Sequence, residues 1–196
     1  MHTYVYLVRH GESPKNGDER SRGLTERGKR DAQFVTDILK EEGIDLVLSS
    51  PYSRSVLTVE KLAADIGQEV IIIEDLKERV FAAQQTRMPD TDLSLLLKKS
   101  FDDPLYTLPG AESNEACQKR AIHVLNELLH NYRGKKVAFG THGTVMTLMM
   151  NAYDKQYGLN FLLQTTKPDI YKMEFDGQKL VGVTRLWSGQ EGGVSC

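Results

Sequence analysis

The feature that most constrains the fold is the alternation of short apolar segments with longer amphipathic ones. Apolar residues recur at helical spacing in the longer segments. The short segments are rich in β-branched and aromatic residues, as is typical of buried strands, and they span residues 4–8, 44–48, 70–73 and 136–140. Such alternation favours parallel strands joined by helical crossovers. The sequence therefore predicts an α/β fold with three layers, a mostly parallel central sheet and helices on both faces.

Local signals mark where these elements begin and end. Thr25 stands where a helix N-cap is expected, and Gly43 and Gly67 stand where helices are expected to stop. Asp176-Gly177 is typical of a tight turn, which predicts a final hairpin. Because no linker, repeat or low-complexity tract interrupts the chain, we predict one domain over residues 1–196.

One stretch breaks the pattern. From Lys77 to Gly110 the helical and strand periodicities fade among prolines and aspartates, and only a short helix around Leu93–Leu97 is expected. Long irregular insertions in compact domains often form lids or binding surfaces. We therefore predict that an irregular insertion at about residues 77–110 shapes substrate choice.

Composition excludes several classes of function. The chain has 196 residues, of which 40% are hydrophobic and 27% charged, and a formal net charge of -2. These values are ordinary for a globular protein and do not suggest a nucleic acid or an anionic membrane as partner. No apolar stretch approaches the roughly 20 residues that span a bilayer. The N-terminal apolar run is too short for a signal peptide, and the two cysteines suggest no disulfide framework. We expect a cytoplasmic protein, and the sequence makes no prediction of its oligomeric state.

Polar signatures follow three of the predicted strands. They are Arg9-His10-Gly11, the segment from Ser49 to Arg54, and Thr141-His142-Gly143. In open α/β sheets, ligands bind at the carboxyl ends of the strands, where helix N-termini also present free N–H groups. We therefore expect the three signatures to converge on one pocket.

The chemistry of such a pocket points to phosphoryl transfer. Arg9 and Arg54 would supply planar guanidinium groups that match phosphate oxygens and stay charged. A histidine such as His10 or His142 can attack phosphorus through one ring nitrogen while a neighbour holds the other N–H. Phosphoryl transfer needs positioned positive charge and an in-line nucleophile, and this set provides both.

A metal site is the competing interpretation of two histidines. Arg9 beside His10 opposes it, because a fixed cation repels a bound cation. The sequence also lacks HExxH, CxxC and a dense carboxylate cluster beside either histidine. We expect neither a metal nor an organic cofactor.

Taken together, the motifs resemble those of the histidine phosphatase superfamily, which has the phosphoglycerate mutase-like fold. An isolated Arg-His-Gly would be weak support, but five matching segments occur in order. They are Leu7–Ser13 with Asn16, Leu24–Gly28, Ser49–Arg54, Pro109–Ser113 and Thr141–Gly143.

The resemblance implies roles for the matching residues. His10 would be the nucleophile that becomes phosphohistidine, while Arg9, Arg54 and His142 hold the transferring phosphoryl group. Glu78 would first protonate the leaving oxygen as general acid and then activate water as general base. Two further residues, Asn16 and Gly143, complete the implied phosphate-binding set.

Two departures separate this chain from the mutase members of the family. The residues after Glu78-Arg79 are Val-Phe-Ala instead of His-Tyr-Gly, and the segment from Asn16 to Leu24 is short. The chain is therefore more similar to the phosphatase members. Arg20 and Arg22 are either surface charges or contacts to a second anionic group of the substrate.

These observations predict a metal-independent phosphatase that hydrolyses phosphomonoesters through phospho-His10. The partner would be a small phosphorylated substrate, with a phosphoprotein as a further option. Two alternatives stay open: a phosphoglycerate mutase-type phosphotransferase, and a phosphate-binding module without turnover. The combination of His10, His142 and Glu78 argues against the module, since a pure binder needs no general acid.

Overall fold

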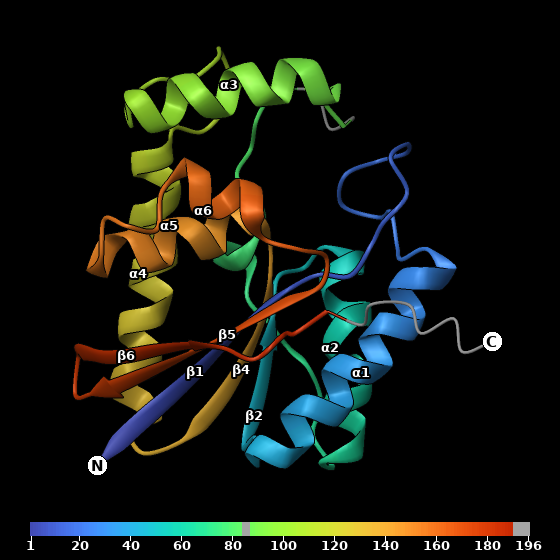
Figure 1. Ribbon diagram of the computed structural model, residues 1–196, viewed down its shortest axis with the longest axis vertical. Coiled ribbons are helices and arrows are strands. Elements are labelled where there is room, and N and C mark those ends of the chain that lie inside the picture. The colour runs from blue at the N-terminus through green and yellow to red at the C-terminus, as the bar shows by residue number, and fades with distance from the viewer. Residues whose placement is uncertain (84–86, 190–196) are drawn as a thin grey trace.

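A single six-stranded sheet forms the middle of the molecule (Figure 1). The computed structural model describes residues 1–83 and 87–189. The parallel strands are β1 (His2–Arg9), β2 (Leu46–Ser49), β3 (Ile71–Ile72) and β4 (Lys136–Thr141). The antiparallel strands are β5 (Asp169–Asp176) and β6 (Lys179–Arg185). Their order is β3-β2-β4-β1-β5-β6, so the predicted mostly parallel sheet is confirmed, and the predicted hairpin forms its antiparallel end.

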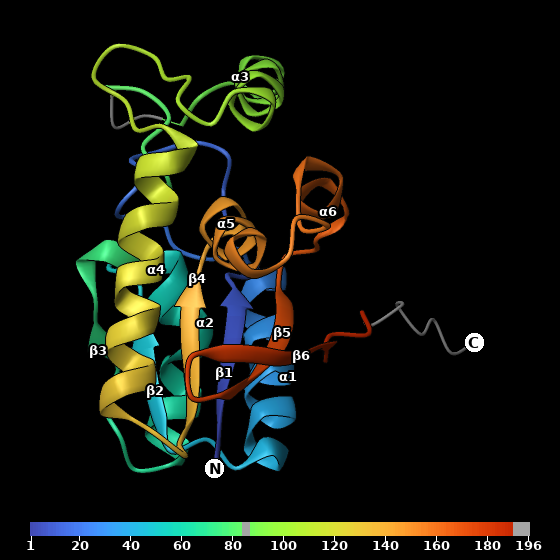
Figure 2. The same ribbon diagram turned by 90° about the vertical axis from the view of Figure 1, so that its left-hand side faces the viewer.

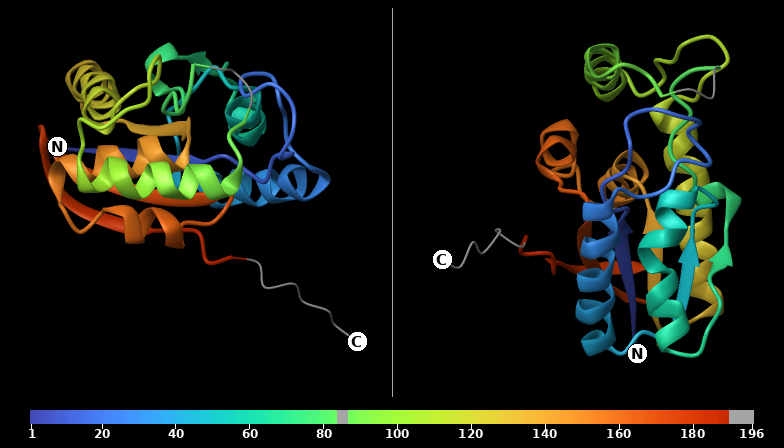
Figure 3. Two further views of the ribbon diagram at one scale, coloured as in Figure 1. Left: turned by 90° about the horizontal axis from the view of Figure 1, so that it is seen from above. Right: turned by 90° about the vertical axis from the view of Figure 1, so that its right-hand side faces the viewer.

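Helices cover both faces of this sheet, which confirms the predicted layers (Figure 3). One face carries α1 (Glu26–Glu42) and α2 (Ser53–Asp65), and the other carries α4 (Asn114–Asn131) and α5 (Gly143–Tyr153). Side chains of β1 alternate between the two apolar cores: Val5 and Leu7 belong to one, Tyr6 and Val8 to the other. This alternation follows from the two-residue period of a strand, and it makes β1 the central buried element.

The remaining helices lie over the carboxyl ends of the parallel strands (Figure 2). They are α3 (Asp90–Asp102) and α6 (Leu159–Gln164). A single 3₁₀ turn, η1 (Glu74–Leu76), leads from β3 into the segment that carries Glu78. Within the described part of the chain, no helix is long and apolar enough to cross a membrane.

The segment from residue 77 to 110 is more regular than predicted. The short helix expected around Leu93–Leu97 is the 13-residue α3, so its predicted length was wrong. Pro89 precedes the helix and Asp90 and Asp92 occupy its first turn, where carboxylates interact favourably with the helix dipole. The prolines and aspartates that resemble loop signals are therefore signals of a helix end. Residues 84–86 of this segment lie outside the described residues.

Helix α1 packs closely against the loop that follows β1. The hydroxyl of Thr25 accepts a hydrogen bond from the Gly28 N–H at 3.0 Å, which confirms Thr25 as the N-cap. Gly28 is buried, and a Cβ on it would overlap the carbonyl oxygen of Glu12. A Cβ on Gly11 would lie 3.0 Å from the Gly28 oxygen. Gly11, which directly follows His10, therefore allows the close approach of α1 to the loop after β1.

We predict that Gly28→Ala destabilises the fold, because the added methyl must push α1 away from a rigid backbone. The free energy of unfolding should fall by about 1–3 kcal/mol, as for other overpacked sites. Arg30→Ala on the exposed side of the same helix is the control and should change it by less than about 0.5 kcal/mol. Denaturant midpoints measure both, and equal midpoints for the two variants would contradict the close packing.

Candidate active site

The sheet brings the three polar signatures together, as predicted. Strand β4 lies between β2 and β1, and its register pairs Thr141 with Arg9 and Gly140 with Ser49. The strands therefore end level with one another. The chain continues from β1 with the His10 N–H donating to the Thr141 carbonyl at 3.0 Å.

A cavity of about 240 Å³ opens at these strand ends. Arg9, His10, Arg54 and Glu78, which come from three separate segments, all line it. Apolar side chains of α3 and α6 form the opposite wall, namely Leu93, Leu97, Leu162 and Leu163. The cavity is therefore lined by charged side chains at the strand ends and by apolar side chains on the side of α3 and α6.

The contacts of His10 favour a neutral imidazole in which one ring nitrogen is unprotonated. The residue is 5% exposed, and Nδ1 is 2.7 Å from the Gly11 carbonyl oxygen, which can only accept a hydrogen bond. Nδ1 therefore carries the proton, and Nε2 keeps its lone pair and accepts a hydrogen bond from Arg54 Nε at 3.2 Å. Burial, and then the charges of Arg54 and Arg9, lower the pKa of His10 well below its usual value. Neutral Nε2 is the form that can attack phosphorus.

His142 lies behind His10 and does not line the cavity. It is fully buried, and its ring centroid is 5.2 Å from that of His10. Its Nε2 is 2.7 Å from the Ser50 hydroxyl, and Tyr52 packs edge-on against it. Its Nδ1 is buried without a hydrogen-bond partner in the described residues. Burial lowers the pKa of His142 as well, so two neutral rings lie side by side.

Arg54 is positioned by a residue that sequence reasoning missed, Glu19. The Arg54 guanidinium donates to the Glu19 carbonyl and, at 2.9 Å, to its carboxylate. Arg22 donates to the same carboxylate at 2.9 and 3.0 Å. Burial and the nearby Arg22 lower the pKa of Arg54 to about 10, which leaves it charged at neutral pH. One carboxylate therefore orients two arginines beside His10.

Arg9 is held from the loop before β5. It donates to the carbonyl of Thr165 at 2.9 Å and to the hydroxyl of the same residue. The next residue, Thr166, donates its N–H to Asp169 at 2.9 Å. Asp169 is fully buried and forms two 2.9 Å hydrogen bonds with Arg185. This chain of contacts fixes the loop that orients Arg9.

Gly143 packs directly against the guanidinium group of Arg9. It begins α5 directly after His142, and a Cβ built on it would lie 2.8 Å from Cζ of Arg9. Gly143 is buried, and it does not line the cavity. Its small size therefore makes room for a guanidinium, which is a packing role different from the direct phosphate contact that the resemblance implied.

Glu78 reaches the cavity from the segment after η1, as predicted. Its Oε1 accepts a hydrogen bond from the Arg79 N–H at 2.8 Å. Burial raises the pKa of Glu78, although Arg54 and Arg9 act in the opposite direction. Arg120 fixes this segment by donating a hydrogen bond to the Lys77 carbonyl at 2.9 Å. Arg120 in turn donates two hydrogen bonds, at 2.6 and 2.8 Å, to the Glu112 carboxylate. Glu112 belongs to the Pro109–Ser113 motif, and its contacts explain that motif.

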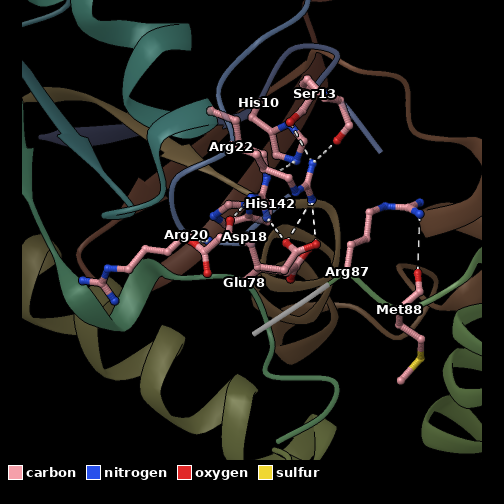
Figure 4. Close-up of polar contacts among 12 residues, drawn as sticks. His10, Ser13, Asp18, Arg20, Arg22, Glu78, Arg87, Met88 and His142 are labelled. Carbon is pink, nitrogen blue, oxygen red and sulfur yellow. Dashed lines mark hydrogen bonds and ion pairs between the residues drawn. The ribbon is translucent and has the colours of Figure 1, made fainter. Parts of the chain in front are cut away.

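Two predicted contacts lie apart from the catalytic cluster. Asn16 is exposed and does not line the cavity. Arg20 points away from the cluster (Figure 4) and forms a paired contact with Glu74 at 3.1 and 2.7 Å. Arg22 does lie in the cavity wall, so the structure separates the two arginines that the sequence grouped.

Two further cations in the wall were not predicted, Arg87 and Lys167. Each is a single basic residue in a segment without periodicity or motif, so no sequence signal marks it. Among the described residues, no group of three or more His, Cys, Asp or Glu side chains could hold a metal ion.

Comparisons with known proteins agree with this geometry. Residues 5–186 match the model of the histidine phosphatase superfamily (branch 1). The chain is 36% identical over 151 residues to the probable phosphoglycerate mutase GpmB of Photorhabdus laumondii, covering 72% of this chain and 70% of that protein. It is 27% identical over 153 residues to the uncharacterized phosphatase PhoE of Bacillus subtilis, covering 76% of each.

A solved structure shows the same fold. Phosphoserine phosphatase from Entamoeba histolytica, in complex with 3-phosphoglyceric acid, superposes with a TM-score of 0.78 at 23% identity, covering 96% of this chain and 98% of that one. The strand-end motifs, the sheet and the match over nearly the whole chain agree. The chain therefore belongs to the histidine phosphatase superfamily, branch 1.

Proposed function

We propose that this protein is a metal-independent phosphatase that hydrolyses small phosphomonoesters in two steps through a phosphohistidine on His10. The observation that carries the proposal is the state of His10. Its Nδ1–H is committed to the Gly11 carbonyl, which leaves Nε2 as a neutral base in a cavity that Arg9, Arg54 and Glu78 share. The enzyme class agrees with the phosphatases among its relatives.

In the first step, His10 Nε2 forms a bond to phosphorus as the ester P–O bond breaks. Arg9 and Arg54 hold the phosphoryl oxygens and stabilise their charge, and His142, which packs against the His10 ring, helps to position the nucleophile. Glu78, which burial biases toward its protonated form, gives its proton to the leaving oxygen.

In the second step, the roles of acid and base reverse. The Glu78 carboxylate accepts a proton from a water molecule, whose oxygen attacks phosphorus as the N–P bond breaks. Inorganic phosphate leaves, and His10 and protonated Glu78 are restored. No electrons are transferred, and no metal is needed, because the arginines supply the positive charge.

A mutase-type phosphotransferase is the second candidate, and the 36% identity to a probable phosphoglycerate mutase favours it. Such an enzyme would return the phosphoryl group from His10 to a second hydroxyl instead of to water. A requirement for a phosphorylated donor, together with phosphoglycerate interconversion faster than phosphate release, would decide for the mutase.

The proposed nucleophile is tested by His10→Ala. Hydrolysis of p-nitrophenyl phosphate in excess chelator should fall at least about a thousandfold, because the covalent route is lost. Binding of inorganic phosphate, measured by calorimetry, should persist because Arg9 and Arg54 remain. His123→Ala, at an exposed position of α4, is the control and should keep normal rates. Near-normal turnover by His10→Ala would exclude the mechanism.

The proposed acid is tested by Glu78→Gln and by the pH profile. The variant should lose about a hundredfold or more on esters with poor leaving groups and less on p-nitrophenyl phosphate. The wild-type rate should fall as pH rises through the raised pKa of Glu78, since the acid must be protonated. It should fall on the acidic side only below the usual histidine pKa, since His10 titrates low. Glu60→Gln, on the exposed side of α2, is the control; equal losses on both ester types would remove Glu78 from this role.

The packing of Arg9 against Gly143 is tested by Gly143→Ala. The methyl must displace the guanidinium, so kcat/KM should fall about tenfold to a hundredfold, as expected for a misplaced catalytic group. Gly182→Ala, whose Cβ would lie 3.8 Å from its nearest neighbour, should keep normal kinetics. Unchanged kinetics in a folded Gly143→Ala protein would show that the position of Arg9 does not depend on a glycine at residue 143.

A further inference from the structure

Three further cations line the catalytic cavity besides the two arginines assigned to the phosphoryl group. Arg22 comes from the loop after β1, Arg87 from the segment before α3, and Lys167 from the loop before β5. All three line both the catalytic cavity and an adjoining hollow of about 640 Å³. Arg87 lies on the opposite side of the catalytic cluster from Arg20 (Figure 4). The cluster therefore lies where the catalytic cavity adjoins the larger hollow.

The charges in this cluster are only partly compensated. Arg22 shares the Glu19 carboxylate with Arg54, and Arg87 pairs with Asp90. Lys167 forms no hydrogen bond or ion pair with any of the described residues. A cation that has no carboxylate partner and lies in a cationic wall attracts an anion. The cavity thus has a place for negative charge beyond the phosphoryl site.

The surroundings of Lys167 also indicate a place for a second negative charge. Although the residue as a whole is exposed, desolvation of its ammonium group and then the charges of Arg9, Arg87 and Arg22 together lower the pKa of Lys167 to about 8. Its charge also contributes to the lowered pKa of His10. Lys167 and His10 also line the same cavity of about 240 Å³, so one small molecule can contact both.

We propose that Lys167, with Arg22 and Arg87, forms a second anion subsite that binds a carboxylate or a second phosphate on the leaving group. The preferred substrates are then small di-acidic phosphomonoesters. This inference rests on the proposed phosphatase function and specifies its substrate class. A small ligand is favoured over a phosphoprotein because Leu93 and Leu97 of α3 and Leu162 of α6 wall the same 240 Å³ cavity.

The test compares pairs of esters that differ by one acidic group. O-Phosphoserine and O-phosphoethanolamine differ by a carboxylate, and propane-1,3-diol bisphosphate and monophosphate differ by a phosphate. In the wild type, kcat/KM for the di-acidic member should be higher by about tenfold or more in at least one pair, as expected for one added charge-assisted contact. The pair that shows the preference identifies the acidic group.

Variants then assign the preference to the subsite. Lys167→Met should reduce the ratio of kcat/KM values in the preferred pair to near one, and Lys167→Arg should keep part of it. Lys119→Met, at an exposed position of α4, is the matched control and should keep all of it. As pH rises through about 8, Lys167 loses its proton, so the wild-type ratio should shrink while that of Lys167→Arg should not. Of the groups facing it, Arg9 and Glu78 act on the phosphoryl group that both esters of a pair share, so their effect cancels in the ratio. Arg22 and Arg87 are the same in the wild type and in Lys167→Arg, so a difference between these two proteins reports Lys167.

Several outcomes would overturn the subsite. They are ratios near one in the wild type, an undiminished ratio in Lys167→Met, or faster hydrolysis of phosphopeptides than of every small ester. The proposed phosphatase function is judged separately, by turnover of p-nitrophenyl phosphate. Should turnover be absent, calorimetry with both esters of a pair on the His10→Ala protein still tests the subsite, because binding needs no nucleophile.

Discussion

The parallel pairing of β1 with β4 is the interaction on which the rest of the site depends. It sets Arg9 opposite Thr141 and ties the His10 N–H to the Thr141 carbonyl, so two segments more than 130 residues apart end at the same level. Because β1 is buried on both faces, a one-residue slip would exchange its two sets of core side chains. The cost of that exchange fixes the register, and the register fixes the positions of Arg9, His10 and His142. The geometry of the catalytic groups is therefore a consequence of packing the sheet.

The electrostatics of the cavity follow from placing several cations in a partly desolvated space. Burial and the charges of Arg9 and Arg54 both keep His10 neutral, which is the state a nucleophile needs. The same cations would hold Glu78 ionised, but the effect of burial is larger and raises its pKa. Burial acts in opposite directions on an acid and on a base, so one environment prepares both groups. The cations that we propose to bind the phosphoryl group thus also help to set the protonation of the proposed nucleophile.

The sequence predicted the part of the site that is built from regular structure. Arg9, His10, Arg54 and His142 follow strands whose apolar runs are visible, and the rule that strand ends meet at one edge is enough to group them. Glu19, Arg87 and Lys167 could not be predicted, because each lies in a loop whose path depends on contacts far away in sequence. Glu19 bonds Arg54 across 35 residues, and Thr165, beside Lys167, bonds Arg9 across 156. The length of α3 was missed for another reason: its capping residues are also typical loop residues.

The strand ends, which could be predicted, and the loops, which could not, are also suited to different tasks in the proposed enzyme. The proposed chemistry needs geometry accurate to a fraction of an ångström, and strand ends held by a buried sheet supply it. Recognition of the leaving group needs only a few well-placed charges and walls. These come from loops and from α3 and α6, which contact the rest of the fold through few elements. On the proposed function, a change in Arg87, Lys167 or Leu97 is expected to alter which ester is bound without moving His10, whereas a change in Gly143 acts directly on Arg9. The proposal therefore assigns substrate choice and chemistry to different layers of the structure, which makes them separable.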